Sequence, residues 1–497
     1  MKPLRNAILS GIAVAIVLGG CASQPETIVI NDTPKSPGPS AQPADTAKAE
    51  DEISAEFKQM VVGEIHPITT LDPLFADNNS AKRTLQLLYE GLVRYDSSGE
   101  ITPAIAKRWQ VTGDSLTYVF TLRDNLFYHD DNIFSSGVGR KLVARDVKFA
   151  FERMAENSVP AHAAELFMDI DGFEPYFNEQ RNILNPAFRE LEGVSGIQVT
   201  SDTTVVFNLA QQDRNFLHKL ASPYASIYPR EAVTENPGNF AGVGSGPFEL
   251  SQQVGDSVYI FAKYDDYNPG TKPPVLDRID VIVEENESNM LKSMGAGDIH
   301  VIPEMGPEMI DNMLTDEGTL SPAYISNYTL RFPGGSTVYT LLHNPESGIP
   351  AGYLENRLSG LQLAPFLQQF PSGVLDISSL TDTVSSTVDN PPGIIYSSYP
   401  GDIFQRWMLQ KLSGYWNGDP KLNIVRIRTP TRLTAMYTET FTPAYPGHAA
   451  PSSRNMLMRY SIEQSVLSIK PISNLHFNRY PWWIDYRSAD MPGIDRL

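Results

Sequence analysis

The sequence predicts an α/β fold that is divided into more than one lobe. A chain of 497 residues is long enough for two or three domains. Segments with the period of two that is typical of strands alternate with segments of helical spacing, so strands and helices are mixed along the chain. Hydrophobic residues make up 41% of the chain, which is sufficient for packed cores.

The folded part of the chain is expected to begin near Phe57. The clearest strand is 116–122, where side chains alternate in character, and the clearest helix is 144–154, with Val147, Phe151 and Met154 on one face. Further strands are predicted at 61–65, 196–199, 203–209, 258–261, 279–283 and 422–427, and further helices at 80–92, 287–294, 401–412 and 455–467.

The charge of the chain limits its partners. The formal net charge at pH 7 is −19. An acidic surface repels phosphate backbones, so nucleic acid is not expected as a partner. No apolar run after the first twenty residues approaches the length that spans a membrane.

Cys21 is the only cysteine, so it cannot form an internal disulfide or a cysteine-based metal site. It follows a basic start and a short apolar run (7–18), which is typical of a secretory signal. The string L-G-G-C (18–21) resembles the lipobox of bacterial lipoproteins, and the alternative is an ordinary signal with an accidental cysteine. The resemblance implies that residues 1–20 are removed and that Cys21 carries lipid. Residues 21–56, rich in proline, serine and alanine, are expected to form a flexible tether.

The catalytic patterns that can be read from a sequence are absent. The histidines form no H-E-x-x-H zinc motif, and no G-x-S-x-G nucleophile turn occurs. The string G-V-G-S-G (242–246) is not a phosphate loop, because it continues into a predicted strand, and it is interpreted as a tight loop. His129-Asp130-Asp131 is compatible with a metal site, but a solvated turn is the simpler interpretation. Neither an enzyme nor a cofactor nor a metal is expected, and a hydrolase on a misread fold is the weakest alternative.

Seven short motifs stand in order between residues 71 and 300. They are L-D-P (71–73), L-Y-E-G-L (88–92), G-E-I-T-P-A-I-A-K-R-W (99–109), D-S-L-T-Y-V-F-T-L-R (114–123), V-A-R-D-V-K-F-A-F (143–151), G-S-G-P-F (244–248) and A-G-D-I-H (296–300). In this order they resemble the motifs of the family 5 extracellular solute-binding proteins, the oligopeptide- and dipeptide-binding group that serves ABC importers. Each motif alone is weak, and their shared order makes the resemblance specific.

The resemblance implies a two-lobed fold like that of the periplasmic binding proteins (type II, cluster C-like), with an inserted subdomain in lobe I. Crossing segments near 330–340 and 470–480 would form the hinge, and the lobes would close around a ligand. The implied divisions are lobe I at 57–330 with its insertion at about 93–209, a shortened lobe II at 331–475, and a return segment to lobe I at 476–497.

The same resemblance implies a membrane-anchored monomer whose body lies in the periplasm or outside the cytoplasmic membrane. It would capture peptides or similar small solutes between its lobes and deliver them to an ABC permease. The residues implied to bind ligand are Asn78, Asn79, Ser80, Gly244, Ser245 and Gly246, with a surface turn as the alternative for these polar loop positions.

Lobe II is expected to lack one binding element. Peptide binders of the family carry a W-x-x-D-Y-x-D-P segment whose aspartate holds the amino terminus of the ligand, and none is found between Thr429 and Ser453. W-W-I-D-Y (482–486), which contains Asp485, is superficially similar but is interpreted as a core strand. Two hypotheses follow: a peptide receptor that tolerates N-blocked ligands, or a degenerate relative that serves as a structural or regulatory lipoprotein.

Overall fold

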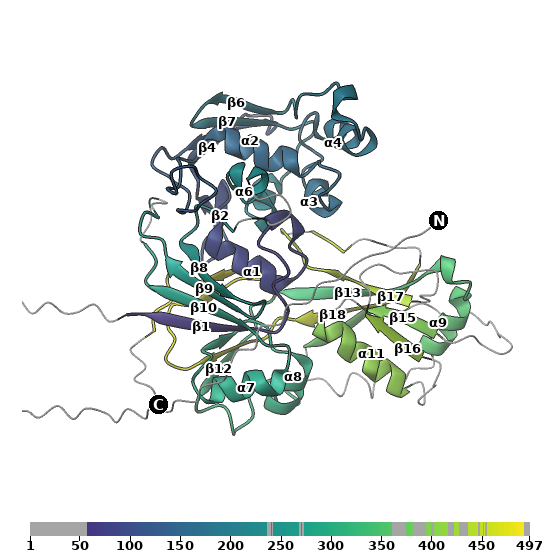
Figure 1. Cartoon of the computed structure of the whole chain (residues 1–497). Coiled ribbons are helices and arrows are strands. Elements are labelled where there is room, and N and C mark those ends of the chain that lie inside the picture. Colours follow the sequence, from purple (N-terminus) through teal and green to yellow (C-terminus); the bar gives the residue numbers. More distant parts are fainter. Residues whose placement is uncertain are drawn as a thin grey trace, which may run out of the picture. The chain divides into compact units, whose positions relative to one another are not determined.

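The computed structural model describes residues 57–491, apart from 236–239, 241, 268–269, 271–272, 360–373, 381–393, 399–401, 416–421, 427–435, 446–447, 451 and 453–454. Cys21 and the predicted tether lie outside the described residues. The described chain is built around three larger sheets flanked by helices, which is the predicted α/β class (Figure 1). Within this described part, no helix is both long enough and apolar enough to cross a bilayer.

The sheet of lobe I has seven strands in the order β12-β19-β11-β1-β10-β9-β8. β1 pairs in parallel with β10 and β11, and the other pairings are antiparallel. Met60 and Val62 of β1 pack into one core and Val61 into another, so this central strand is apolar on both faces. The strands are β1 (Gln59–Glu64), β8 (Phe248–Val254), β9 (Val258–Lys263), β10 (Arg278–Val283), β11 (Val301–Ile302), β12 (Tyr328–Arg331) and β19 (Val466–Ile469).

Helix α1 (Asn79–Leu88) follows β1 and ends earlier than the predicted 80–92. The backbone after Leu88 is extended and bonds to other loops, since Glu90 O accepts from Ile227 N and Gly91 O accepts from Ile105 N. Continuing the helix would remove both bonds. The other helices of lobe I are α5 (Phe216–Leu220), α6 (Glu231–Thr234), α7 (Glu287–Gly295) and α8 (Pro307–Met313), of which α7 was predicted.

The inserted subdomain has an antiparallel sheet in the order β4-β5-β7-β6. Helix α2 packs on it through Phe151, whose ring lies 5.1 Å from that of Phe207, and Phe207 in turn contacts Phe120. The strand pair and the helix predicted here are confirmed. The elements are β4 (Ala106–Val111), β5 (Thr117–Leu122), α2 (Ala144–Arg153), α3 (Ala161–Glu165), α4 (Phe173–Asn182), β6 (Ile197–Ser201) and β7 (Thr204–Asn208).

The sheet of lobe II has six strands in the order β14-β18-β13-β17-β15-β16. β15, α11 and β16 form a parallel strand–helix–strand unit, which confirms the helix and the strand predicted there. The elements are β13 (Ser336–His343), α9 (Ala351–Ser359), β14 (Leu375–Leu380), β15 (Ile394–Ser398), α11 (Ile403–Tyr415), β16 (Leu422–Arg426), β17 (Met436–Phe441) and β18 (Met456–Glu463).

The chain passes between these two sheets twice. The first crossing joins β12 to β13 through residues 332–335, inside the predicted 330–340. The second lies at Gln464 and Ser465, between β18 and β19, rather than near 470–480. The helix predicted at 455–467 is wrong, because Met458, Tyr460 and Ile462 point inward with the period of a strand.

Smaller elements complete the described chain. Four 3-10 turns each begin with a proline, whose fixed φ suits the first position of such a turn. The remaining elements are the pair β2 (Val93–Tyr95) and β3 (Ile101–Pro103), the pair β20 (His476–Phe477) and β21 (Ile484–Asp485), and the turns η1 (Pro73–Phe75), η2 (Pro186–Phe188), η3 (Pro223–Ala225) and η4 (Pro345–Ser347).

Candidate functional site at the boundary between the lobes

A buried ionic cluster lies at the carboxyl edge of the lobe I sheet. Glu64 ends β1 and Glu304 follows β11, and because these strands are parallel their ends meet at one edge. Arg83 of α1 bonds to both carboxylates, at 2.8 Å from Nε to Glu64 Oε1 and 3.3 Å from Nη2 to Glu304 Oε2. Burial alone would lower the pKa of Arg83, but the two glutamates raise it above its ordinary value. One arginine therefore balances two carboxylates, which leaves an excess of negative charge.

Both crossing segments touch this cluster. Asn79 Nδ2 donates to Thr337 Oγ1 at 3.1 Å, and Thr337 is at the start of β13 directly after the first crossing. Gln464 of the second crossing donates through Nε2 to Pro303 O at 2.9 Å and to Pro481 O at 3.2 Å. Arg83 Nη1 also donates to Pro481 O. The cluster thus lies where the two lobes are joined.

Three buried polar atoms at this place have no hydrogen-bond partner among the described residues. They are Asn79 Oδ1, Gln464 Oε1 and the Ser465 hydroxyl. A buried acceptor without a donor costs about 1–3 kcal/mol, and most such groups in folded proteins are satisfied by protein, water or ligand. These three atoms therefore have hydrogen-bonding capacity that water or a bound ligand can use.

Lobe II contributes Asp402, which is 8% exposed and precedes α11. Its Oδ1 accepts from Gln405 N at 2.9 Å and its Oδ2 from Thr440 Oγ1 at 3.0 Å. Burial raises the pKa of Asp402, and His66, which follows β1 in lobe I, opposes that rise. Each carboxylate oxygen of Asp402 therefore accepts one hydrogen bond from lobe II and retains a lone pair for another donor.

The loop after β17 also meets lobe I. Trp482 Nε1 donates to Pro443 O at 3.1 Å, and Lys219 Nζ lies 5.5 Å from the centre of the Tyr445 ring. The Tyr445 ring stacks on His448 at 4.6 Å. Burial, together with Lys219 and Lys82, lowers the pKa of His448 to about 4, so its imidazole is neutral at pH 7.

The predicted residues 78–80 have three different surroundings. Asn78 caps α1, accepting from Ala81 N at 2.9 Å. Ser80 is fully buried and donates to Glu64 Oε2 at 2.6 Å. Asn79 alone reaches lobe II and retains an unpaired oxygen, so it is the member of the three with capacity left for a ligand.

The predicted loop 244–246 lies against the end of α1. Gly246 N donates to Leu88 O at 2.9 Å, and a Cβ built on Gly244 would lie 1.9 Å from the same oxygen. His129 closes the loop from the other side, because its ring bonds to Gly244 N and Gly246 O. The backbone of both glycines is therefore engaged within the protein, whereas the buried hydroxyl of Ser245 has no partner among the described residues.

His129 thus serves this loop, and the turn 129–131 does not gather ligands for an ion around it. Among the residues that the structure describes, no group of three or more His, Cys, Asp or Glu side chains is placed to hold a metal ion.

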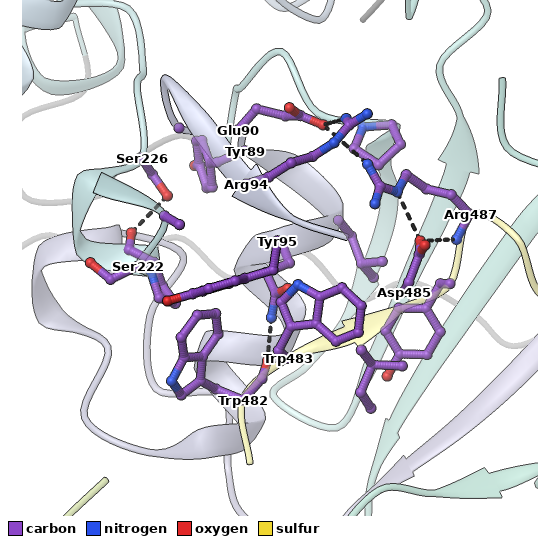
Figure 2. Close-up of a pocket in the computed structure, with 18 of the residues that line it drawn as sticks. Tyr89, Glu90, Arg94, Tyr95, Ser222, Ser226, Trp482, Trp483, Asp485 and Arg487 are labelled. Carbon is purple, nitrogen blue, oxygen red and sulfur yellow. Dashed lines mark hydrogen bonds and ion pairs between the residues drawn. The ribbon is translucent and has the colours of Figure 1, made fainter. Parts of the chain in front are cut away.

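The segment 482–486 was predicted to be a core strand: its five side chains are buried, but only Ile484–Asp485 forms a strand, the two-residue β21. Asp485 accepts from Arg487 Nε at 2.8 Å and from Ser488 Oγ at 3.1 Å. Burial would raise the pKa of Asp485, but Arg487 holds it below its ordinary value. Figure 2 shows this pair at the edge of a small pocket of about 70 Å³, with Trp483 and Arg94 also lining it. Asp485 is therefore already paired within lobe I.

Sequence reasoning missed Glu304, Gln464 and Asp402. None of them stands in a recognised motif, and both Asp402 and Gln464 were placed inside predicted helices, at 401–412 and 455–467. A usable signal existed at Asp402, where an aspartate after Pro400-Gly401 precedes a helical pattern and is typical of a helix cap.

The fold has been solved many times in other proteins. The structure of Haemophilus influenzae OppA in complex with RPPGFSPFR superimposes with a TM-score of 0.67 at 13% identity, covering 88% of this chain and 99% of that chain. The Escherichia coli murein tripeptide binding protein MppA gives a TM-score of 0.66 at 14% identity, with the same coverage. At such identities the likeness is one of fold alone, and it shows the two-lobed fold.

Similarity in sequence is limited to part of the chain. The dipeptide-binding protein of Escherichia coli (strain K12) is 29% identical over 252 residues, which are 49% of this chain and 44% of that protein. Heme-binding protein A of Haemophilus influenzae is 26% identical over 284 residues, or 54% of this chain and 48% of that protein. The matches span less than half the length of these relatives. The family model for bacterial extracellular solute-binding proteins, family 5 (middle), matches residues 100–347. The chain belongs to the family 5 bacterial extracellular solute-binding proteins.

Proposed function

We propose that this protein encloses a peptide or a similar small solute between its two lobes and delivers it to an ABC importer. Its family is one of binding proteins rather than enzymes. The relatives named above bind a dipeptide or heme, and one superimposed structure holds a peptide, which together favour a small organic solute. The ligand would lie at the lobe boundary, where closure can surround it.

The observation that carries this proposal is the set of unpaired buried atoms of Asn79, Gln464 and Ser465. These side chains lie at the crossings, where a bound solute would contact both lobes. N–H groups of a peptide backbone are donors, and such donors would satisfy the two amide oxygens. A ligand that does so gains hydrogen bonds whose absence otherwise costs stability.

The charge at the boundary favours a ligand with a positive end. Glu304 and Asp402 supply buried carboxylates from opposite lobes, and Arg83 balances only part of this charge. An ammonium group placed beside Asp402 would add a charge-assisted bond to a carboxylate whose hydrogen bonds within the described residues come from Gln405 N and the Thr440 hydroxyl. Asp402 is therefore our candidate for the carboxylate that holds the amino terminus of the ligand, for which no aspartate was found between Thr429 and Ser453. Ligands with a free amine should then bind better than N-blocked ones.

Calorimetric titration tests this site, using the solute that mass spectrometry identifies in the purified protein. We expect Asn79→Ala and Asp402→Asn each to lower affinity about tenfold or more, the scale on which losing one partner of a buried bond is felt. N-acetylation of a peptide ligand should have a similar effect. Asp376→Asn, on an exposed position of β14, is the matched control and should bind normally.

Unchanged affinity in both variants would place the ligand elsewhere. If no solute co-purifies and none raises thermal stability, the alternative of a structural or regulatory lipoprotein replaces the transport function. Direct contacts across the boundary, such as that between Trp482 and Pro443, are what that alternative would use.

We also propose that the chain is exported and anchored by lipid on Cys21, as the L-G-G-C string predicts. Cys21→Ser should accumulate as an unprocessed precursor that incorporates no labelled fatty acid. Incorporation of label into the variant would refute the assignment. A monomer with an ABC permease as its membrane partner completes the proposal.

A further inference from the structure

The loop 183–191, between α4 and β6 of the inserted subdomain, presents large apolar side chains to solvent. Leu184 is 74% exposed, Phe188 71% and Leu191 41%. Single exposed apolar residues are ordinary on protein surfaces, but a group of them marks an interaction site. In the part of the chain that the structure describes, no other stretch of this length exposes three such side chains. We call residues 183–191 the apolar loop.

The apolar loop is held in place by bonds to its own neighbours. Both oxygens of Glu179 accept from its backbone, at 2.8 Å from Glu190 N and 3.0 Å from Leu191 N. Arg189 Nε donates to Ile183 O at 2.9 Å, and Asn185 Oδ1 accepts from Ala187 N at 3.1 Å. These hydrogen bonds order the backbone of the apolar loop while its apolar side chains stay exposed, and a backbone that is already ordered loses less entropy when a partner binds.

The charges around the apolar loop are mainly acidic. Glu190 in the apolar loop and Glu192 directly after it are exposed and have no ion-pair partner among the described residues. Arg189 and Arg181, the latter over the ring of Phe177 at 4.4 Å, keep their positive charges, but residues 179–192 hold three glutamates against these two arginines. The rim is thus negative, on a chain whose net charge is already −19.

We propose that the apolar loop inserts into an apolar groove with a basic rim on a second protein. An apolar centre with an aromatic ring, enclosed by a polar rim, is the layout of protein–protein interfaces. A bilayer with anionic headgroups would be repelled by the acidic rim, and a second copy of the chain would bring two acidic rims together. This surface lies in the inserted subdomain, so the inference does not rest on the solute site.

Site-specific cross-linking in the producing cells tests the proposal, with a photoreactive residue in place of the exposed Ala187 of the full-length chain. The protein captured is identified by mass spectrometry, purified and titrated with the unlabelled chain. We expect its affinity to fall about tenfold or more for Leu184→Ser/Phe188→Ser and for Glu190→Lys/Glu192→Lys, and to weaken with salt. Val138→Ser, at a position 59% exposed in another loop of the subdomain, should leave affinity unchanged.

Each contrary result overturns the inference. Failure to capture a protein at Ala187, or equal affinity for all variants, would mean that the apolar loop is not an interface. Self-association in sedimentation that disappears in Leu184→Ser/Phe188→Ser would assign the loop to a second copy. Flotation of the purified chain with phosphatidylcholine–phosphatidylglycerol vesicles, lost in the same variant, would assign it to a bilayer. Unaltered melting temperatures confirm that the variants are folded.

Discussion

Asp72, in the L-D-P motif, is held by a residue of the inserted subdomain. Arg153 of α2 donates through Nη1 to Asp72 Oδ1 at 2.9 Å and to the Tyr228 hydroxyl at 3.1 Å. Asp72 also caps η1 by accepting from Leu74 N. Its carboxylate is therefore used by the fold, and the motif marks an internal brace rather than a contact to ligand.

Another single residue, His129, makes the stability of the protein depend on pH. Burial lowers the pKa of His129 to about 4, and its bond to Gly246 O and the carboxylate of Asp130 only partly oppose this. A histidine in the unfolded chain titrates near pH 6.5. Between about pH 6.5 and 4 the unfolded chain gains a proton that the folded chain does not, so the free energy of unfolding falls as the pH falls. One such histidine lowers the free energy of unfolding by at most about 3 kcal/mol over this pH range.

Urea unfolding at pH 7 and pH 4.5 measures how much His129 contributes to the loss of stability at low pH. His129→Gln keeps a donor and an acceptor beside the loop 244–246 but does not titrate, so its loss of stability on acidification should be smaller than that of the natural chain. His476→Gln, at a half-buried position in β20, is the control and should behave like the natural chain. An equal loss in His129→Gln would show that other groups govern the acid response.

Between elements, the backbone of the loop 244–246 lies close against the end of α1. Glycine is required there because a Cβ on Gly244 would overlap Leu88 O, and one on Gly246 would lie 2.5 Å from the Leu88 carbonyl carbon. The loop thereby fixes where α1 ends, and α1 carries Asn79 and Arg83.

Gly244→Ala should therefore destabilise the protein by roughly 1–3 kcal/mol or more, the range found for overpacked cores. The urea midpoint measures this change. Gly113→Ala is the matched control, because no atom lies within 4 Å of the Cβ it would add. Equal midpoints for the two variants would contradict the close packing described here.

The local sequence pattern predicted an element correctly where the tertiary structure buries the face that the pattern makes apolar. The alternation at 116–122 and the single apolar face at 144–154 correspond to β5 and α2, since each buries one face. At 455–467 the spacing of the apolar residues is compatible with both a helix and a strand. The segment forms the strand β18 because it pairs with β13 and β14. The site was less accessible to sequence reasoning, because Asn79, Gln464 and Asp402 are brought together only by the sheets and crossings.

For the whole molecule, the two crossings and the ionic cluster of Arg83 lie where the lobes are joined, so they are the elements that the proposed closure would use. Thr337 and Gln464 begin or end the crossings and are both bonded to the lobe I side of the boundary. Rotation about residues 332–335 and 464–465 would separate Asn79 from Thr337 without breaking either sheet.

Adding the identified solute should therefore shrink the radius of gyration in solution scattering and raise the melting temperature by mass action. The Asp402→Asn variant at the same solute concentration is the control and should respond less. A solute that binds in calorimetry but changes neither quantity would rule out closure as the binding mechanism.

The position of β19 in the lobe I sheet has a consequence for how this protein is made. β19 lies between β12 and β11, yet it is Val466–Ile469, whereas β1 of the same sheet is Gln59–Glu64. Synthesis starts at the amino terminus. The edges of β11 and β12 that pair with β19 therefore stay unpaired until residues 466–469 have been made. Pairing across such a separation is slow, and the intermediate offers its edges to aggregation or to a chaperone in the meantime. For the export proposed above, this delay would be an advantage, because the lobe I sheet stays incomplete until β19 has been made.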